Sequence, residues 1–256
     1  MTAPLLIGAT AAHASSTVPA CGTVQAKGKT IVLVHGAWHG GWCWKKVTPL
    51  LQTAGYRVLT PTLTGLGDRA HLLTPSVDLS THIRDVSALL EYEDLHDVML
   101  VGHSYGGMVI SGVADQAGAQ IGHLVYLDAF LPEDGKALKD YAPLPPVRQD
   151  AEWRTPPSGT PQQFGVTDAQ DVAWAAARLG DQPTRTFTEP VRLTTLEKMT
   201  LRRSFIRCTS APFFSEAAER AKRNGYHVRE ILTGGHDVMI TQPEKLTGEL
   251  LQLDRT

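Results

Sequence analysis

A hydroxyl group flanked by glycines is the first feature of this sequence that could do chemistry. Residues 102–107 read GHSYGG and contain the pattern G-x-S-x-G around Ser104, directly after an apolar run. When this pattern joins a strand to a helix, the sharp turn exposes the serine as a nucleophile at the positive end of the helix dipole. Gly102 and Gly106 leave room for a strained turn, and Gly107 lets the helix pack closely on the sheet. A simple helix-capping serine is the alternative, but the flanking patterns favour a nucleophile.

A serine hydroxyl becomes reactive when a base accepts its proton, so a histidine is needed. The chain holds ten histidines, and most lie in the N-terminal tail, in expected loops, on a helix or at strand starts. In this order of strands and helices the base follows the last strand, on the loop before the final helix. His236 has that position, and Gly234 and Gly235 allow the loop to turn back toward Ser104. We therefore predict that His236 is the general base.

The third member of such an arrangement is an acid that orients the imidazole and stabilises its charged form. Asp128 ends the apolar strand YLDAF, where a desolvated carboxylate requires a partner such as protonated His236. No carboxylate follows the strand SFIRCT directly, since residues 210–214 read SAPFF. Glu216 is the alternative acid, and Asp237 is a more distant one. Asp128 is the favoured acid, although a carboxylate there could also serve as a local cap.

Two backbone amides are expected to hold the oxyanion that forms when a carbonyl is attacked. They are the amide after the nucleophile, Tyr105, and one from the loop after the first strand, Ala37. In that loop His35 and His39 have a spacing of four residues, which on a helix would suit a metal. The glycines at 36, 40 and 41 argue against a helix, so we expect no metal site and a bracing role for His35.

These groups require a scaffold in which strand ends meet at one edge. Short apolar strands alternate with amphipathic helices, which predicts an α/β protein with a mostly parallel sheet covered on both faces. The strands are expected at 30–36, 56–63, 97–103, 121–130, 204–209 and 226–232. The helices are expected at 41–55, 79–93, 106–118 and about 215–224, with a final one after Pro243.

The alternation is interrupted by a proline-rich stretch that is too long for a connecting loop. Residues 29–131 and 201–256 are predicted to form the core, and residues 132–200 a helical cap over the carboxyl edge of the sheet, inserted after the fourth strand. Aromatic side chains of the cap, together with one on the loop after the first strand, would line an apolar pocket. We call that loop, which carries Ala37, the oxyanion loop. These candidate substrate contacts are Trp38, Tyr141, Trp153, Phe164 and Trp174.

Composition excludes several classes of partner. The 256 residues are 42% hydrophobic and 20% charged with a formal charge of −2, so there is no basic footprint for nucleic acid or an anionic membrane. No stretch approaches the roughly 20 apolar residues of a spanning helix. Cys21, Cys43 and Cys208 show no C-x-x-C spacing, which gives little support to zinc or redox chemistry. A monomer and a homodimer are both compatible with the sequence.

The first 28 residues are expected to lie outside the fold. Residues 3–22 read APLLIGATAAHASSTVPACG, with a short apolar run followed by the small-x-small pattern Ala12-His13-Ala14. The positively charged leader of an export signal does not precede it. The segment is therefore either a truncated export signal, which would take the protein out of the cytoplasm, or a plain disordered tail of a cytoplasmic protein.

Taken together, the motifs resemble those of the α/β-hydrolase superfamily. The resemblance is narrower to the esterase and hydroxynitrile-lyase group, which includes plant methyl-ester esterases and bacterial carboxylesterases of the pyrethroid-hydrolase type. It is carried by VLVHGAWHGGWCW, TLTGLGDRAHLL with DLSTHI, VGHSYGGMV, LVYLDAFLPEDG and TGGHDVMITQPEKL, from residue 31 to about 250, with the cap least alike. TLTGLGDRAHL and LDAFLPEDG point to the bacterial branch. Some members place the acid after the fourth of these strands, which matches Asp128, whereas the plant pattern has it after the strand that here reads FIRCT.

The resemblance also separates hydrolysis from cyanide elimination. Hydroxynitrile lyases carry a threonine in the first loop and a lysine after the histidine, where this chain has Gly36 and Asp237. The implied activity is that of a serine carboxylesterase for hydrophobic, pyrethroid-like esters, which requires no cofactor. A lactone, amide or C–C bond hydrolase with the same residues is the nearest alternative. A binding protein without turnover is another, because fold alone does not fix function, although the complete set of serine, histidine and acid argues against it.

Overall fold

The structure is a computed structural model, and it describes residue 1, residues 29–210 and residues 212–255. The predictions for the N-terminal tail, including the choice between export signal and plain tail, lie outside the described residues, as does Cys21. Cys43 and Cys208 are buried free thiols. Within the described residues, none of the helices has the length and apolar character needed to cross a membrane.

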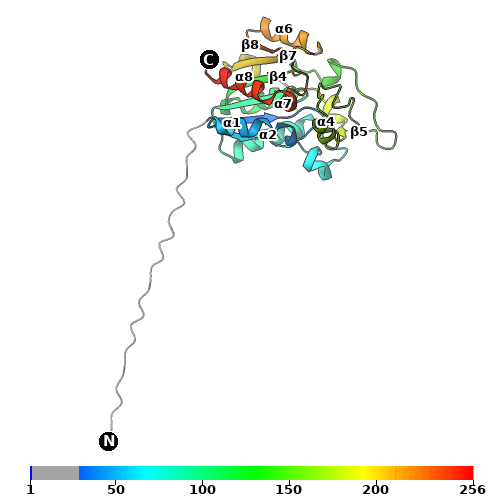
Figure 1. Cartoon of the computed structure of the whole chain (residues 1–256), viewed down its shortest axis with the longest axis horizontal. Coiled ribbons are helices and arrows are strands. Elements are labelled where there is room, and N and C mark those ends of the chain that lie inside the picture. Colours follow the sequence, from blue (N-terminus) through cyan, green and yellow to red (C-terminus); the bar gives the residue numbers. More distant parts are fainter. Residues whose placement is uncertain (2–28, 211, 256) are drawn as a thin grey trace.

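One sheet of six strands organises the chain (Figure 1). The strand order is β2-β1-β3-β4-β7-β8, and every neighbouring pair is parallel. The carboxyl ends of all six strands therefore meet at one edge, where ligands of α/β proteins bind. The strands are β1 Thr30–Val34, β2 Arg57–Leu59, β3 Val98–His103, β4 Ile121–Leu127, β7 Arg202–Cys208 and β8 His227–Ile231. The predicted α/β class and parallel sheet are confirmed.

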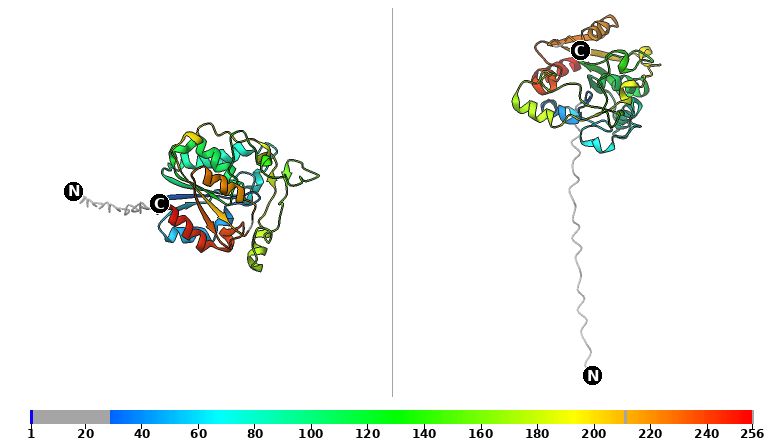
Figure 2. Two further views of the ribbon diagram at one scale, coloured as in Figure 1. Left: turned by 90° about the horizontal axis from the view of Figure 1, so that it is seen from above. Right: turned by 90° about the vertical axis from the view of Figure 1, so that its right-hand side faces the viewer.

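Helices cover both faces of this sheet (Figure 2). One face carries α2 (Leu79–Tyr92), α3 (Gly106–Ala117) and α6 (Ser215–Arg223). The other carries α1 (Val47–Thr53), α7 (Val238–Thr241) and α8 (Pro243–Arg255). Alternate residues of β1 enter opposite cores, Val32 and Val34 one and Ile31 and Leu33 the other, because side chains of a strand alternate between the two faces. This is why β1, with the sequence TIVLV, reads as a nearly unbroken apolar run.

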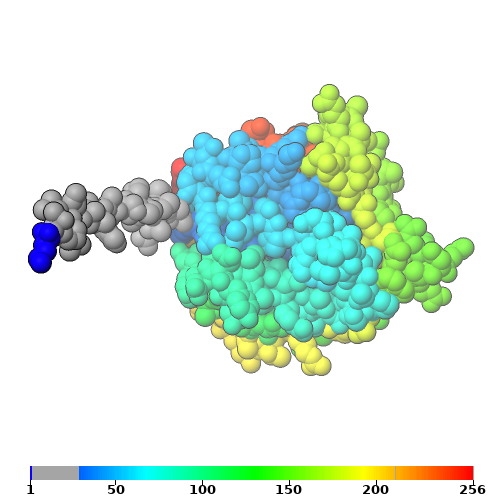
Figure 3. All heavy atoms as spheres, turned by 90° about the horizontal axis from the view of Figure 1, so that it is seen from below, coloured from blue at the N-terminus to red at the C-terminus, as the bar shows by residue number. Residues whose placement is uncertain are grey.

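The insertion after β4, residues 132–200, lies at the carboxyl edge of the sheet, and we call it the cap segment. In the space-filling view its green and yellow atoms project beyond the core at one end (Figure 3). It contains η4 Leu138–Asp140, β5 Arg154–Thr155, α4 Ala169–Ala176, β6 Gln182–Pro183, α5 Arg185–Thr188 and η5 Leu196–Lys198. The helices were expected, but β5 and β6 also pair as a small antiparallel sheet, which the sequence did not predict.

Two core elements differ from their predicted extents. The helix expected over 41–55 is divided into a 3₁₀ turn, η1 (Gly41–Trp44), and α1, which begins at Val47. The strand expected over 56–63 pairs only as Arg57–Leu59. Beyond it, Pro61 has no N–H to donate to a neighbouring strand, and Thr62 instead accepts a hydrogen bond from the Gly41 amide through its hydroxyl (3.0 Å).

Candidate active site

Ser104 lies at the turn between β3 and α3 in a left-handed backbone conformation, with φ of +54°. Its carbonyl oxygen accepts hydrogen bonds from the amides of Gly107 (3.0 Å) and Phe130 (3.1 Å), which fix the turn from both sides. A Cβ at residue 102 would lie 2.6 Å from the carbonyl oxygen of Gly106, and one at residue 106 would lie 2.9 Å from that of His35. The two glycines of the motif are therefore required by close backbone approach.

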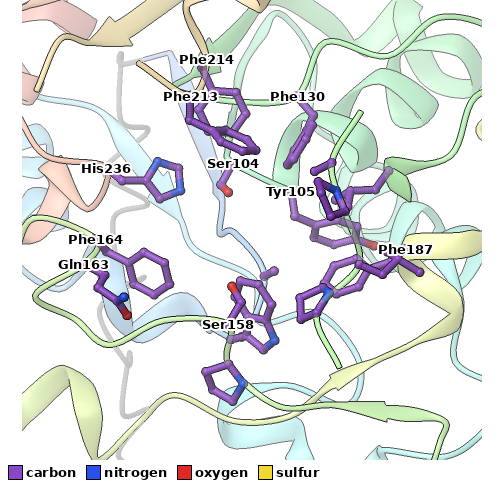
Figure 4. A pocket seen from close by; sticks show the side chains of 18 of the residues that line it. Ser104, Tyr105, Phe130, Ser158, Gln163, Phe164, Phe187, Phe213, Phe214 and His236 are labelled. Atoms are coloured by element: carbon purple, nitrogen blue, oxygen red, sulfur yellow. The ribbon is translucent and has the colours of Figure 1, made fainter. Parts of the chain in front are cut away.

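His236 and Ser104 face the same cavity, and the imidazole ring lies beside the serine side chain (Figure 4). The Nδ1 atom of His236 donates to Asp128 Oδ2 over 2.7 Å. This contact fixes the ring and leaves Nε2 as the nitrogen available to a serine proton. Within the described chain the Ser104 hydroxyl has no hydrogen-bond partner; such catalytic contacts often tighten only when substrate is bound.

Asp128 is held as firmly as the serine. Its backbone is also left-handed, with φ of +42°, and its side chain is almost fully buried. Oδ1 accepts the amide hydrogen of Cys208 over 3.0 Å, and the Asp128 amide donates to the carbonyl of Ile206 over 2.7 Å. The carboxylate is thus satisfied by one backbone amide and one imidazole, which is how a buried acid is tolerated.

The alternative acids lie elsewhere. Glu216 is exposed on α6, and Asp237 is buried with its Oδ2 atom 3.2 Å from His39 Nε2. Among the described carboxylates, the contact with the His236 ring is made by Asp128. Sequence reasoning had left the acid open, and the geometry favours Asp128.

The predicted oxyanion residues flank Ser104. Ala37 and Tyr105 both line the cavity, and neither amide N–H donates to another described residue. Two buried amides without acceptors beside a nucleophile are what a tetrahedral intermediate needs for its negative charge. The Tyr105 hydroxyl points away from the amide and contacts His82 Nδ1 at 2.9 Å.

His35 braces the oxyanion loop, as predicted. Its Nδ1 atom donates to the carbonyl of Gly36 (2.8 Å), and its Nε2 atom accepts from the amide of Leu63 (3.1 Å). Burial lowers the pKa of His35 to about 3, so the ring is neutral and fits this pair of contacts. No cluster of three or more metal-ligating side chains occurs within the described chain.

A cavity of about 800 Å³ opens above Ser104. Its wall combines aromatic rings from the core and the cap with a row of prolines from the cap. The rings are Trp38, Phe130, Phe164, Phe187, Phe213 and Phe214, and the prolines are Pro143, Pro145, Pro146, Pro156 and Pro157.

Of the five predicted substrate contacts, Trp38 and Phe164 line this cavity, whereas Tyr141, Trp153 and Trp174 do not. The Tyr141 hydroxyl is occupied by the amide of Glu133 (2.7 Å). Trp153 lies against the guanidinium of Arg154, 5.7 Å from the ring centre.

Trp174 packs edge-on against Trp42 of η1 at 5.1 Å, so it contacts the core rather than the cavity. Sequence reasoning missed Phe213 and Phe214, which follow β7 where the plant pattern has its acid. Phe214 stacks on the His236 ring at 5.5 Å. A pair of phenylalanines in that place was a signal that the position faces the site.

Comparison with known proteins identifies the family. The model of the alpha/beta hydrolase family matches residues 31–249. The chain belongs to this family. The match extends over nearly all of the described fold, so the resemblance read from the motifs is confirmed.

The relatives of this chain include a named esterase, a binding protein and a solved pyrethroid hydrolase. The carbendazim-hydrolysing esterase of Nocardioides sp. (strain SG-4G) is 41% identical over 240 residues, which is 87% of this chain and 98% of that protein. Salicylic acid-binding protein 2 of Nicotiana tabacum is 28% identical over 255 residues, or 89% and 97% of the two chains. A solved pyrethroid hydrolase from Sphingobium faniae JZ-2 superposes with a TM-score of 0.69 at 26% identity, covering 88% and 97%. This α/β-hydrolase is thus an ester-hydrolysing enzyme.

Proposed function

We propose that this α/β-hydrolase is a serine carboxylesterase that cleaves hydrophobic esters through an acyl-enzyme on Ser104. The observation that supports it most is the 2.7 Å contact between Asp128 Oδ2 and His236 Nδ1, made beside the serine. The contact leaves Nε2 of His236 free to accept the serine proton, which is the requirement for a serine nucleophile at neutral pH.

Acylation uses each of these groups once. Ser104 Oγ attacks the ester carbonyl while His236 Nε2 takes its proton, and the carbonyl oxygen becomes an oxyanion between the amides of Ala37 and Tyr105. The buried Asp128 carboxylate stabilises the imidazolium that forms. His236 then returns the proton to the departing alkoxide, the C–O bond of the ester breaks, and an alcohol leaves.

Deacylation repeats the sequence with water as the nucleophile. His236 removes a proton from water, the hydroxide attacks the acyl carbon, and the same two amides hold the second oxyanion. The proton returns to Ser104 Oγ, and the carboxylic acid is released. These steps require no cofactor, since the protein supplies the nucleophile, the base and the charge stabilisation.

The wall of the cavity supports a neutral, hydrophobic substrate. No lysine or arginine is among the described residues that line it, and its polar groups apart from the proposed catalytic ones are Ser158 and Gln163. A charged acid or alcohol portion would be desolvated there without an ion partner. The volume of about 800 Å³ suits a ligand of drug size, and the relatives named for carbendazim and pyrethroids act on molecules of that class.

The division into a core, residues 29–131 and 201–256, and a cap, residues 132–200, is part of this proposal. In it the core supplies the reacting groups, and the cap supplies the proline wall together with Phe164 and Phe187. Substrate preference would then change with the cap while the chemistry stays with the core.

A fluorophosphonate probe tests the nucleophile. We expect the folded protein to be labelled at Ser104 and the Ser104→Ala variant to be neither labelled nor active on p-nitrophenyl esters. A labelled serine elsewhere, or an unlabelled but folded protein, would overturn the proposal in favour of a ligand-binding protein.

Paired variants test the acid. Asp128→Asn should lower kcat by about 10⁴, because an amide fixes the wrong tautomer of His236. Glu216→Gln should change kcat by less than about twofold, as expected for an exposed side chain that makes no contact with His236. The reverse ranking would reassign the acid to Glu216.

A substrate panel tests the scissile bond. With neutral aryl esters, matched amides, lactones and β-diketones of equal size, we expect turnover of the esters to exceed that of the others. Faster cleavage of a lactone, an amide or a C–C bond would leave the proposed catalytic residues in place but would reassign the bond that the enzyme cleaves.

A further inference from the structure

A buried histidine and a buried carboxylate form a second pair next to the proposed catalytic one. His39 Nε2 lies 3.2 Å from Asp237 Oδ2, with side-chain exposures of 3% and 1%. The mechanism above uses neither group. A buried carboxylate next to the catalytic base is costly without a function or a partner, because burial penalises charge.

Both ring nitrogens of His39 face oxygen atoms that can accept a hydrogen bond. Nδ1 donates to the carbonyl of Ala37 over 2.7 Å, and Nε2 donates to Asp237. Burial lowers the pKa of His39, but the Asp237 carboxylate and the two hydrogen bonds outweigh it, so the pKa is raised. A protonated His39 satisfies both contacts and forms with the Asp237 carboxylate a pair whose net charge is zero.

Each partner is one or two residues from a group that the chemistry needs. His39 is bonded to Ala37, whose amide is one of the two proposed oxyanion donors. Asp237 directly follows His236 in the chain. The Asp237 amide also donates to the carbonyl of Phe164 in the cap over 2.9 Å. The pair therefore joins the oxyanion loop after β1 to the loop that carries the base, 198 residues later in the chain.

Resting on the proposed function, we propose that His39 and Asp237 are positioning residues that act as one ion pair, holding the Ala37 amide and the His236 ring in a fixed relation during ester hydrolysis. Neither touches the substrate. The pair matters most when negative charge forms at the oxyanion, because the Ala37 amide and the His236 ring must then both be correctly positioned relative to Ser104.

Electrostatics supports a role beyond simple packing. An unpaired Asp237 carboxylate would place a second buried negative charge beside the Asp128–His236 pair. That charge would oppose the oxyanion. With His39 charged, this negative charge is neutralised, and the positive partner lies on the oxyanion loop itself. A preorganised arrangement of this kind stabilises a transition state without reorganisation.

The experiment compares alanine and isosteric variants at both positions. For Asp237→Ala and His39→Ala we expect kcat per titrated active site to fall about a hundredfold with KM changed less than about threefold, since misplacement of catalytic groups by ~1 Å has this effect. Asp237→Asn retains an acceptor for His39 and should recover part of the loss. The double alanine variant should have a kcat no lower than that of the less active single variant, because the two residues act as a unit.

The inhibition constant of a trifluoromethyl ketone would not change if the pair had only a structural role. This ketone forms a tetrahedral adduct with the serine, so its inhibition constant should rise in parallel with the loss of kcat, while that of the unfluorinated ketone stays nearly constant. The control is Asp171→Asn, which breaks the 2.6 Å Lys46–Asp171 pair between core and cap. It should change kcat by less than about twofold, as expected for a partly exposed pair.

The outcomes are separable. The inference is overturned if the variants keep kcat per titrated site, even when fewer sites can be titrated or the melting temperature falls. The pair would then have only a structural role. Activity retained by Ser104→Ala in the same assay overturns the proposed function instead.

Discussion

Ser104 and Asp128 share a backbone conformation that few non-glycine residues adopt, with φ of +54° and +42°. They end the neighbouring strands β3 and β4, and the Ser104 amide donates to the carbonyl of Leu127. Strain of this kind costs on the order of 1–3 kcal/mol for each residue and persists only where the surroundings enforce it. Here the backbone hydrogen bonds from Phe130 and to Ile206 enforce it.

Two helix glycines should respond oppositely to alanine. A Cβ at Gly107 in α3 would lie 2.0 Å from the carbonyl oxygen of Phe130, whereas a Cβ at Gly248 in α8 would meet nothing within 4 Å. Gly107→Ala should lower the free energy of unfolding by about 1–3 kcal/mol through overpacking. Gly248→Ala should raise it by about 0.5–1 kcal/mol through helix propensity.

Urea unfolding at neutral pH measures both changes. Gly107→Ala should also lower esterase activity, because Phe130 lines the cavity. Equal stability of the two variants would contradict the close approach of α3 to the chain after β4.

At the residue scale, sequence reasoning reaches those groups whose positions follow from strand and helix order. Ser104, Tyr105 and Asp128 directly follow β3 or β4, Ala37 and His236 lie in the loops after β1 and β8, and parallel strands bring such positions to one edge. The aromatic residues of the cap could not be assigned in this way. Trp174 lies on the short helix α4 and Phe164 in the turn before it, and only tertiary contacts decide that Trp174 packs on the core while Phe164 lines the cavity.

Among the elements, the cap segment and the oxyanion loop are joined at Trp38. Its amide donates to Gln182 Oε1 (3.0 Å), its indole N–H to the carbonyl of Thr155 (3.1 Å), and its carbonyl accepts from Gly180 (3.1 Å). These acceptors and donors belong to β5, β6 and the turn between α4 and β6. The small antiparallel sheet of the cap thus holds the residue next to Ala37.

Gln182→Leu, a substitution in the cap segment, should therefore lower the rate of ester hydrolysis at Ser104. It removes the acceptor of the Trp38 amide, and a buried donor without a partner costs about 1–3 kcal/mol of stability. We expect kcat/KM for p-nitrophenyl esters to fall about tenfold as the oxyanion loop shifts.

The matched control is Gln120→Leu. Gln120 lies at the amino edge of the sheet, directly before β4, and donates to the carbonyl of Leu95 over 3.2 Å. The control substitution should leave kcat/KM within about twofold, as expected for an independent site. Equal effects of the two variants would show that Gln182 acts on folding alone.

Element prediction succeeded for the central strands β1, β3 and β4 because each is a mainly apolar run bounded by glycine or charged residues. It missed β5 and β6 because strands of two residues, Arg154–Thr155 and Gln182–Pro183, have no alternation to detect. They pair because the cap folds back on itself, and Asp181 beside them is held by Arg148 and Arg154 at 2.6 Å.

At the scale of the whole molecule, several buried histidines make stability depend on pH. Burial lowers the pKa of His35 to about 3 and that of His82 to about 4. Burial and the neighbouring Arg202 lower the pKa of His123 to about 4. The unfolded chain takes up protons at these histidines near pH 6.5, but the folded chain does not, so acid favours unfolding. His39, whose pKa is raised, has the opposite effect and loses its contribution only as pH rises through that value.

The free energy of unfolding should therefore fall as pH drops from about 6.5 toward 4, by up to about 1.4 kcal/mol per pH unit for each such histidine. Urea midpoints between pH 7.5 and 4.5 measure this slope. His123→Gln removes one of these groups and should reduce the slope by about that amount, whereas His71→Gln, at an exposed position, should leave it unchanged. Carboxylates with lowered pKa values, such as Asp115 beneath the backbone amides of Thr195 and Leu196, add to the loss only below about pH 4. A stability that stays constant from pH 7 to 5 would contradict neutral buried histidines, and with them the hydrogen-bond pattern that places His35 behind the oxyanion loop.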